Sequence, residues 1–184
     1  QETLEYLYKR LPMYQRKGKA AYKSDIGNIV SISKYLDNPH TKFKSIHIAG
    51  TNGKGSTASI IKSLLNEHGK TTHVYSTPHL VKFNERIQLY SKDISDKLLL
   101  EYLYHCEKIN HKNLITYFEI TTTAAFMAFQ DHPADFLILE VGLGGRFDAT
   151  NIIKNKKYSL ITPISMDHQD YLGNSLTKIA YEKL

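Results

Sequence analysis

The sequence of 184 residues contains a single cysteine, Cys106, so no disulfide can form within the chain. This absence excludes the disulfide-stapled class of small secreted domains, and we interpret Cys106 as a packed side chain on a helix. No apolar run approaches the ~20 residues that cross a bilayer, and the N-terminus lacks the apolar core of a signal peptide. We therefore expect a cytoplasmic globular protein with no membrane segment.

The sequence also lacks a concentrated basic patch, although its formal net charge is +6. Its lysines form two loose groups, and neither group is interleaved with aromatic residues in a pattern that is typical of RNA- or DNA-binding proteins. We interpret these groups as solvated loop charge and expect no nucleic-acid partner, although the surplus of positive charge admits a smaller anionic ligand. The groups are Lys17, Lys19 and Lys23, and Lys154, Lys156 and Lys157.

A glycine-rich stretch lies between an expected strand over residues 43–49 and an expected helix over residues 56–68. Its glycines let successive N–H groups point into one concavity, and the following helix adds its unpaired N–H groups. The stretch departs from the general P-loop pattern, because Ile48 replaces a glycine and Gly55 is inserted after the lysine; a glycine turn without a ligand is the alternative. We predict that ATP is bound by Gly50, Thr51, Asn52, Gly53, Lys54, Gly55, Ser56 and Thr57.

The remaining segments alternate between helical and strand patterns. Helices are expected over residues 2–11, from Ser24 or Asp25 to before Asn38, and over 56–68, 97–110, 116–132 and 175–184; strands are expected over 43–49, 71–77, 135–141 and 158–164. The helix over 56–68 is expected to bury Ile60, Ile61, Leu64 and Leu65. Strand, helix and strand in this order imply parallel strands with right-handed crossovers. We predict an α/β fold, a mostly parallel, Rossmann-like P-loop sheet with helices on both faces.

Glu140 ends the apolar run of residues 136–139, which is typical of a strand buried on both faces. A carboxylate at such a position is costly unless it is paired or bound to a metal. P-loop enzymes hold Mg²⁺ with an acidic residue at the end of such a strand. The sequence therefore predicts a magnesium ligand at Glu140.

Two loops resemble those of folylpolyglutamate synthase and dihydrofolate synthase, a family of the Mur ligase superfamily. The first is residues 50–56, and the second is residues 142–151, where Phe147 stands in place of the family's usual leucine. The resemblance covers residues 25–183. It implies an ATP-dependent ligase that adds L-glutamate to a carboxylate of folate or dihydropteroate through an acyl phosphate, with ATP and Mg²⁺ as cofactors.

The resemblance also implies which residues form the site. The implied catalytic residues are Lys54, Glu140, His168 and Lys183, and the implied metal ligands are Thr77, Glu140 and His168. Thr77 stands where the family usually has serine, and Lys183 aligns with a lysine that the family carries as a carbamate. The implied folate- or pteroate-binding residues are Asp25, Ile26, Gly27, Thr116, Tyr117, Phe118, Glu119, Phe147 and Asp148.

Plainer interpretations of several motifs remain open at this point. Residues 25–27 are also a simple helix start, and Thr116 with Glu119 forms a capping-box pattern. Residues 83–87 match a family motif but also fit a surface pair of Glu85 and Arg86. At the level of function, the alternatives are another P-loop enzyme, such as a Mur-type ligase or a small-molecule kinase, and a non-catalytic nucleotide- or nucleic-acid-binding module.

Members of this family are longer than 184 residues and carry a smaller C-terminal domain. We therefore expect residues 1–184 to be the N-terminal part of an incomplete ATP-binding domain that folds as a monomer but does not catalyse alone. Because Lys183 precedes the last residue, we expect its side chain to be open to water and to remain a plain ammonium.

Overall fold

The computed structural model describes residues 25–109 and 115–183, so the helix expected over residues 2–11 lies outside it. The helices are α3 (Gly27–Tyr35), α4 (Lys54–Glu67), α5 (Asp96–Ile109), α6 (Tyr117–Asp131), α7 (Gln169–Leu172) and α8 (Leu176–Lys183). The strands are β1 (Ser45–Ala49), β2 (Thr72–Tyr75), β3 (Ile87–Leu89), β4 (Lys92–Asp93), β5 (Phe136–Glu140) and β6 (Tyr158–Ile161). Short 3₁₀ turns are η2 (Pro39–Thr41), η3 (Phe83–Arg86) and η4 (Ala149–Ile152).

The strands form one sheet in the order β4-β3-β2-β5-β1-β6. The four strands β2, β5, β1 and β6 are parallel, as predicted, whereas β3 and β4 extend one edge in antiparallel pairing and were not predicted. Because the parallel strands all end at the same edge, the segments that follow them meet there. The register pairs Ile48 with Glu140, so the glycine-rich loop and the acidic strand tip leave the sheet side by side.

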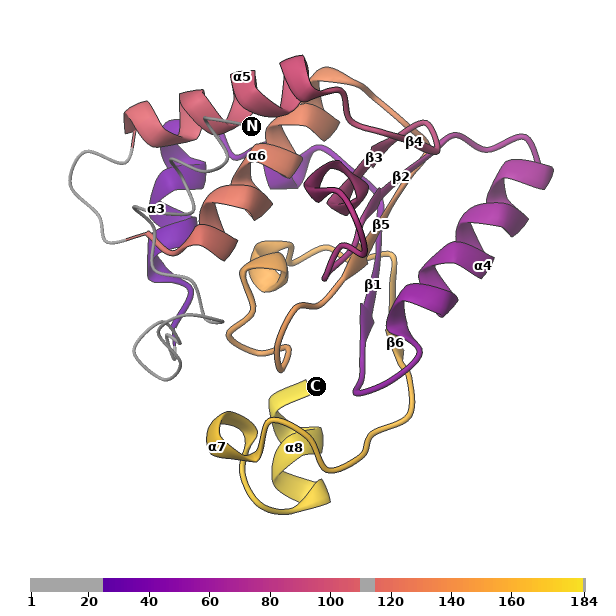
Figure 1. Cartoon of the computed structure of the whole chain (residues 1–184), viewed down its shortest axis with the longest axis vertical. Helices are drawn as coiled ribbons and strands as arrows, with labels where there is room; N and C mark the ends of the chain where they lie inside the picture. Colours follow the sequence, from indigo (N-terminus) through magenta and orange to yellow (C-terminus); the bar gives the residue numbers. More distant parts are fainter. Residues whose placement is uncertain (1–24, 110–114, 184) are drawn as a thin grey trace.

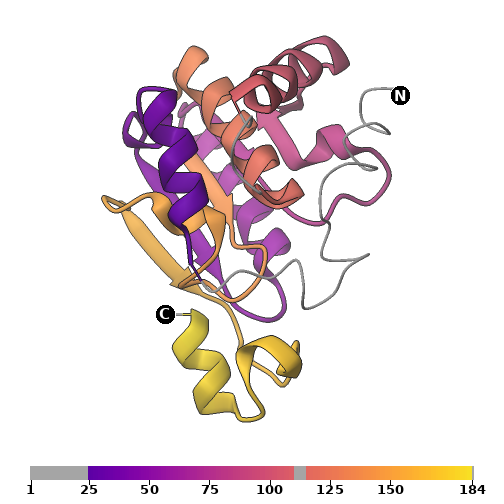
Figure 2. The same ribbon diagram turned by 90° about the vertical axis from the view of Figure 1, so that its left-hand side faces the viewer.

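Helices cover both faces of the sheet, with α4 on one face and α3, α5 and α6 on the other (Figure 1). The larger core lies under α3, α5 and α6, and the smaller one lies between α4 and the sheet. Cys106 is fully buried in the larger core, which confirms its interpretation as a packed side chain. The short helices α7 and α8 lie beyond the edge where the parallel strands end (Figures 1 and 2).

Helix α4 is less buried than the sequence predicts. It begins at Lys54 rather than Ser56, and only Ala58 is buried, while Ile61 and Leu65 are half-buried. Ile60 and Leu64 are 61% and 57% exposed, so the expectation that they are buried is wrong. The reason is that one stripe of the helix faces the sheet, and within residues 25–109 and 115–183 no further layer covers the other stripe.

The described helices are all too short or too polar to cross a membrane. The longest of them, α6, begins at the predicted capping box. The Thr116 hydroxyl accepts a hydrogen bond from the Glu119 N–H at 3.2 Å, and the Glu119 carboxylate accepts one from the Thr116 N–H at 2.7 Å. These bonds satisfy two N–H groups at the start of the helix, so the capping interpretation of Thr116 and Glu119 is confirmed.

Candidate active site

The glycine-rich loop connects β1 to α4, as predicted, and it is pinned to the segment that follows β6. The Thr51 hydroxyl donates to the Ser165 carbonyl at 3.2 Å and accepts from the Ser165 N–H at 3.1 Å. The Asn52 amide donates to the Ser165 hydroxyl at 3.2 Å. The side chains of Thr51 and Asn52 therefore hold the loop in place, and the N–H groups of the first turn of α4 remain for an anion.

Two ammonium groups meet at one carbonyl of this loop. Lys54 Nζ donates to the Gly50 carbonyl at 3.2 Å and to the Thr51 carbonyl at 3.1 Å. Lys183 Nζ donates to the same Gly50 carbonyl at 2.7 Å, although it lies 133 residues away in the chain. The structure therefore gathers two positive charges at the predicted phosphate site.

Lys183 is 6% exposed, so the expectation that it lies open to water is wrong. Helix α8 folds back against the loop after β5: the Arg146 N–H donates to the Glu182 carbonyl at 2.9 Å, and the two side chains form an ion pair at 2.6 Å. Burial and the nearby charge of Lys54 lower the pKa of Lys183. These contacts place the side chain inside the site rather than at a frayed helix end.

Glu140 lies between the end of β2 and the start of α4. Its carboxylate accepts the Thr77 N–H at 3.2 Å, and a Cβ added to Gly55 would lie 3.5 Å from the same oxygen. Burial raises the pKa of Glu140, while the Thr77 N–H and the charge of Lys54 oppose that rise. The structure thus brings together two of the three predicted metal ligands, Glu140 and Thr77.

These residues fit a magnesium ion. Glu140 supplies a buried carboxylate, and Thr77, whose N–H it accepts, carries a hydroxyl, so both residues have oxygen donors. Mg²⁺ is commonly held by one or two carboxylates while it keeps several waters. Over residues 25–109 and 115–183, no group of three His, Cys, Asp or Glu side chains could enclose a metal. His168 caps α7 in a left-handed conformation, with its Nε2 3.6 Å from the Asp167 carboxylate. Its role as a ligand stays a prediction.

The 142–150 loop (Gly142–Thr150) is organised around Asp148. The Asp148 carboxylate accepts from the N–H groups of Gly142 and Leu143 at 3.0 and 2.9 Å, and from the N–H and hydroxyl of Thr150 at 3.0 and 2.6 Å. Burial raises the pKa of Asp148, and these four hydrogen bonds oppose the rise. Asp148 therefore has a clear structural task, and direct contact with folate stays a prediction.

The other predicted folate residues lie around the 142–150 loop. A Cβ on Gly142 would lie 2.6 Å from the Phe118 ring, so the loop passes directly over this ring. Phe147 is covered by the Arg146 guanidinium at 4.3 Å from the ring centroid. Helix α3 packs against η4, which directly follows Asp148, and the Asp25 carboxylate accepts the Gly27 N–H at 2.8 Å. Helices α3 and α6 also contact each other, and both contact η4, so the elements next to the predicted folate residues pack together, with Ile26 half-buried and Tyr117 buried.

The motif at residues 83–87 is not a surface ion pair, so that interpretation is wrong. The Glu85 carboxylate accepts three backbone N–H groups, from Leu80, Val81 and Lys82, at 2.7 to 3.0 Å. Arg86 is 6% exposed, and its Nε donates to the His79 Nδ1 at 2.9 Å. The two side chains instead shape the loop that follows Thr77, a role that sequence spacing does not reveal.

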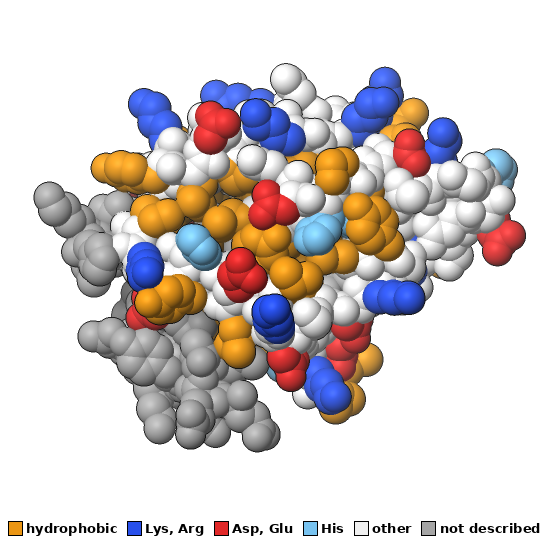
Figure 3. Space-filling view, turned by 90° about the horizontal axis from the view of Figure 1, so that it is seen from above, with side chains coloured by type: hydrophobic (Ala, Val, Ile, Leu, Met, Phe, Trp, Pro, Cys, Tyr) orange, Lys and Arg blue, Asp and Glu red, His pale blue; other side chains and the backbone are white. Residues whose placement is uncertain are grey.

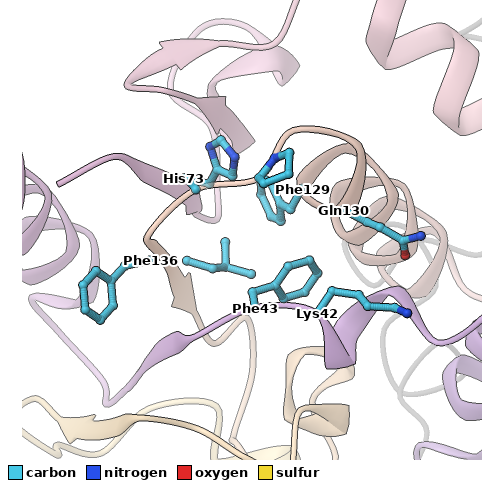
Figure 4. A pocket seen from close by; sticks show the side chains of 9 residues that line it. Lys42, Phe43, His73, Phe129, Gln130 and Phe136 are labelled. Atoms are coloured by element: carbon cyan, nitrogen blue, oxygen red, sulfur yellow. The ribbon is translucent and has the colours of Figure 1, made fainter.

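A cavity of about 100 Å³ lies near the amino ends of β1, β2 and β5, away from the glycine-rich loop at their carboxyl ends. Phe43, His73, Phe129 and Phe136 are among its lining residues (Figure 4). On the face opposite α7 and α8, hydrophobic side chains gather together with histidines (Figure 3). The cavity shares no lining residue with the predicted site, so the site is defined by converging polar groups rather than by this hollow.

Comparisons with known proteins agree with this geometry. Residues 48–184 match the Mur ligase middle domain family. The chain is 40% identical over 172 residues to the dihydrofolate synthase/folylpolyglutamate synthase of Bacillus subtilis, and 40% identical over 161 residues to that of Haemophilus influenzae. These alignments cover 90% and 86% of this chain but 40% and 36% of the relatives. The chain therefore spans about two fifths of the length of the curated relatives that it matches.

Solved structures give the same result. The E. coli FolC protein in complex with DHPP and ADP superimposes with a TM-score of 0.88 at 33% identity, covering 99% of this chain and 42% of that one. A bifunctional folylpolyglutamate synthase/dihydrofolate synthase of Yersinia pestis, complexed with AMPPNP and Mn ion, gives 0.86 at 33% identity with the same coverage. The resemblance inferred from the two loops and the predicted fold class are confirmed.

Proposed function

Because the chain belongs to the Mur ligase middle domain family, we propose that it forms the nucleotide-binding part of an ATP-dependent ligase that adds L-glutamate to a carboxylate of folate or dihydropteroate. The observation that carries this proposal is the convergence of Lys54, Lys183 and Glu140 at the glycine-rich loop, next to the 142–150 loop. The named activities of the relatives and the ADP, AMPPNP and Mn in related structures support it.

The residues of this chain suit the first step of such a reaction. A carboxylate is a poor electrophile, so ATP first transfers its γ-phosphoryl group to it, giving an acyl phosphate and ADP. The glutamate amine then attacks the acyl carbon and displaces inorganic phosphate, which forms the amide. The loop N–H groups and Lys54 would neutralise charge on the phosphates, once Lys54 exchanges the Gly50 and Thr51 carbonyls for phosphate oxygens. Thr77 and Glu140, with His168 as the third predicted ligand, would hold Mg²⁺, which neutralises charge on the transferred phosphoryl group.

We propose that the whole ligase is a longer protein, in which residues 1–184 are the N-terminal part of the ATP-binding domain and a C-terminal domain completes the site. The exposed strand β6 supports this proposal, because parallel sheets are covered on both faces. The exposed apolar side chains of Ile60 and Leu64 on α4 add a surface against which a further layer would pack. The 184 residues alone would then bind nucleotide without turnover. We also propose a cytoplasmic monomer that does not bind nucleic acid.

The test is nucleotide binding by this chain, measured by calorimetry with ADP and Mg²⁺. Lys54→Ala should weaken binding at least tenfold without a change in circular dichroism, because the hydrogen bonds of the Lys54 ammonium within the described residues go to the Gly50 and Thr51 carbonyls of its own loop. Lys97→Ala is the matched control, since Lys97 is exposed on α5. In the longer protein, phosphate release should require both glutamate and dihydropteroate or tetrahydrofolate. Equal ADP affinity of the Lys54 and Lys97 variants would overturn the nucleotide assignment.

A further inference from the structure

A chain of buried hydrogen bonds links the strand before the glycine-rich loop to the 142–150 loop. His47, in β1, places its Nε2 2.7 Å from the Thr150 hydroxyl, and this hydroxyl lies 2.6 Å from the Asp148 carboxylate. The three residues are 7%, 0% and 5% exposed. A polar chain so completely removed from water must satisfy its own donors and acceptors.

The direction of the hydrogen bonds follows from the chemistry of the three groups. An ionised carboxylate only accepts, so the single hydroxyl proton of Thr150 goes to Asp148. The hydroxyl oxygen of Thr150 then accepts, and its donor is His47, which must carry its proton on Nε2. Burial and the charge of Lys156 lower the pKa of His47 to about 3, which keeps the ring neutral at physiological pH.

The chain ends on a carboxylate that ties the two ends of the 142–150 loop together. Asp148 accepts from Gly142 and Leu143 at the start of the loop and from Thr150 at its end, and this fills its four acceptor positions. The Thr150 hydroxyl is the only one of these donors that is itself fixed by a side chain from the central sheet.

The loop has little room to move. A Cβ on Gly142 would approach the Phe118 ring to 2.6 Å, and a Cβ on Gly145 would approach the Lys183 carbonyl to 2.8 Å. The loop is therefore held between a residue of the predicted folate set and the helix that delivers Lys183 to the glycine-rich loop. A shift of the loop would change the distance between these two parts of the site.

We propose that His47 and Thr150 are positioning residues of the ligase site, which set the 142–150 loop for the folate- or pteroate-type acceptor. This proposal rests on the proposed function. His47 orients the Thr150 hydroxyl, Thr150 orients Asp148, and Asp148 fixes the loop against Phe118. None of the three needs to touch the nucleotide for this task, so acceptor binding and nucleotide binding should respond differently.

The experiment compares two variants. Thr150→Val keeps the shape of the side chain but breaks the hydrogen bonds from His47 to Asp148, whereas Thr150→Ser keeps the hydroxyl. In the 184-residue chain, NMR should find the Nε2–H form of His47, and amide exchange of Gly142 and Leu143 should be at least tenfold faster in Thr150→Val. Dihydropteroate binding in the presence of ADP should weaken at least tenfold in Thr150→Val, while ADP binding stays within twofold. Thr150→Ser should behave as wild type in all three measurements.

A second pair of variants tests His47, at the other end of this row of hydrogen bonds, and covers the case in which Thr150→Val fails to fold. His47→Gln keeps an N–H donor and should retain dihydropteroate binding, whereas His47→Leu removes the donor and should lose it. Equal dihydropteroate affinity in Thr150→Val and Thr150→Ser, or in the two His47 variants, would overturn the positioning role alone. If the wild-type protein binds neither ADP nor dihydropteroate, the proposed function is overturned. The proposed role of His47, Thr150 and Asp148 in dihydropteroate binding is then overturned with it.

Discussion

Gly50 should be the least replaceable glycine of the loop, and Gly50→Ala tests this directly. Its φ is +142°, a region that side chains rarely adopt, and a Cβ there would lie 1.8 Å from the Thr162 hydroxyl and 2.9 Å from the Thr162 carbonyl. Gly69→Ala is the matched control. Gly69 also has a positive φ, +70°, but a Cβ there would meet nothing within 4 Å.

The two substitutions share a positive φ and differ mainly in the contact with Thr162, which gives the expected magnitude. The left-handed backbone costs about 1–2 kcal/mol for a residue with a Cβ at Gly69, and the φ of +142° at Gly50 lies in a different, glycine-favouring region with a cost of similar size. At Gly50 the overlap with Thr162 adds about 1–3 kcal/mol of overpacking. At about 2–4 °C per kcal/mol for a chain of this size, the midpoint of thermal unfolding should fall by about 2–8 °C in Gly69→Ala and by about 4–20 °C in Gly50→Ala.

The assay is thermal and urea unfolding followed by circular dichroism, in a wild-type and a Thr162→Ala background. Thr162→Ala removes the hydroxyl that lies 1.8 Å from the added methyl group, so Gly50→Ala should cost less free energy in that background. The relief should be about 0.5–3 kcal/mol, the usual range for side chains in contact. If Gly50→Ala costs no more than Gly69→Ala, or costs the same in both backgrounds, the close packing of the loop against Thr162 is refuted.

Two further predictions concern ionisable groups. Glu140→Gln removes the charge of the buried carboxylate but keeps its shape. The affinity for Mn²⁺ in the presence of ADP, measured by electron paramagnetic resonance, should therefore fall at least tenfold. An unchanged Mn²⁺ affinity would show that Glu140 is not a metal ligand. His47 has its pKa lowered from 6.5 to about 3, so the unfolded chain binds a proton between these values that the folded chain does not. Its contribution to stability is complete above pH 6.5 and declines as the pH falls towards 3, by at most about 1.4 kcal/mol per pH unit. Urea unfolding of His47→Gln should therefore depend less on pH over this window, and an unchanged slope would contradict the buried neutral ring.

Much of the fold could be predicted because its main elements carry strong local signals. The run at residues 136–139 is apolar without alternation, and it forms the central strand β5, buried between β1 and β2. Gly69 ends α4 in a left-handed conformation, as a glycine after a helical pattern predicts. These signals depend on neighbouring residues only, so the sequence alone contains them.

The missed elements are those that only tertiary contacts create. β3 and β4 are three and two residues long, and they pair as an antiparallel extension of β2. Segments so short have no periodicity to detect. The same limit explains Glu85, whose carboxylate serves N–H groups three to five residues earlier in a turn that no pattern marked.

The candidate site likewise contains residues that a local sequence pattern predicts and residues whose positions only the folded chain shows. The glycine-rich loop and Glu140 follow from local pattern, but the position of Lys183 depends on α8 folding back over the 142–150 loop. His47 could have been noticed, because a histidine inside the apolar strand of residues 45–49 is a polar group at a buried position. Its partner Thr150 is 103 residues away, which only the folded chain reveals.

The contacts at the Gly50 carbonyl bear on the proposed role of the glycine-rich loop as a site for a polyanion. Lys54 and Lys183 carry the same charge and are held together by one acceptor, so each raises the free energy of the other. Among residues 25–109 and 115–183, the nearby Glu140 carboxylate accepts the Thr77 N–H and forms no ion pair with either ammonium. A triphosphate would supply several negative oxygens to both ammonium groups at once. The unliganded arrangement therefore stores repulsion that an anion relieves, and the two lysines are already in place before the anion arrives.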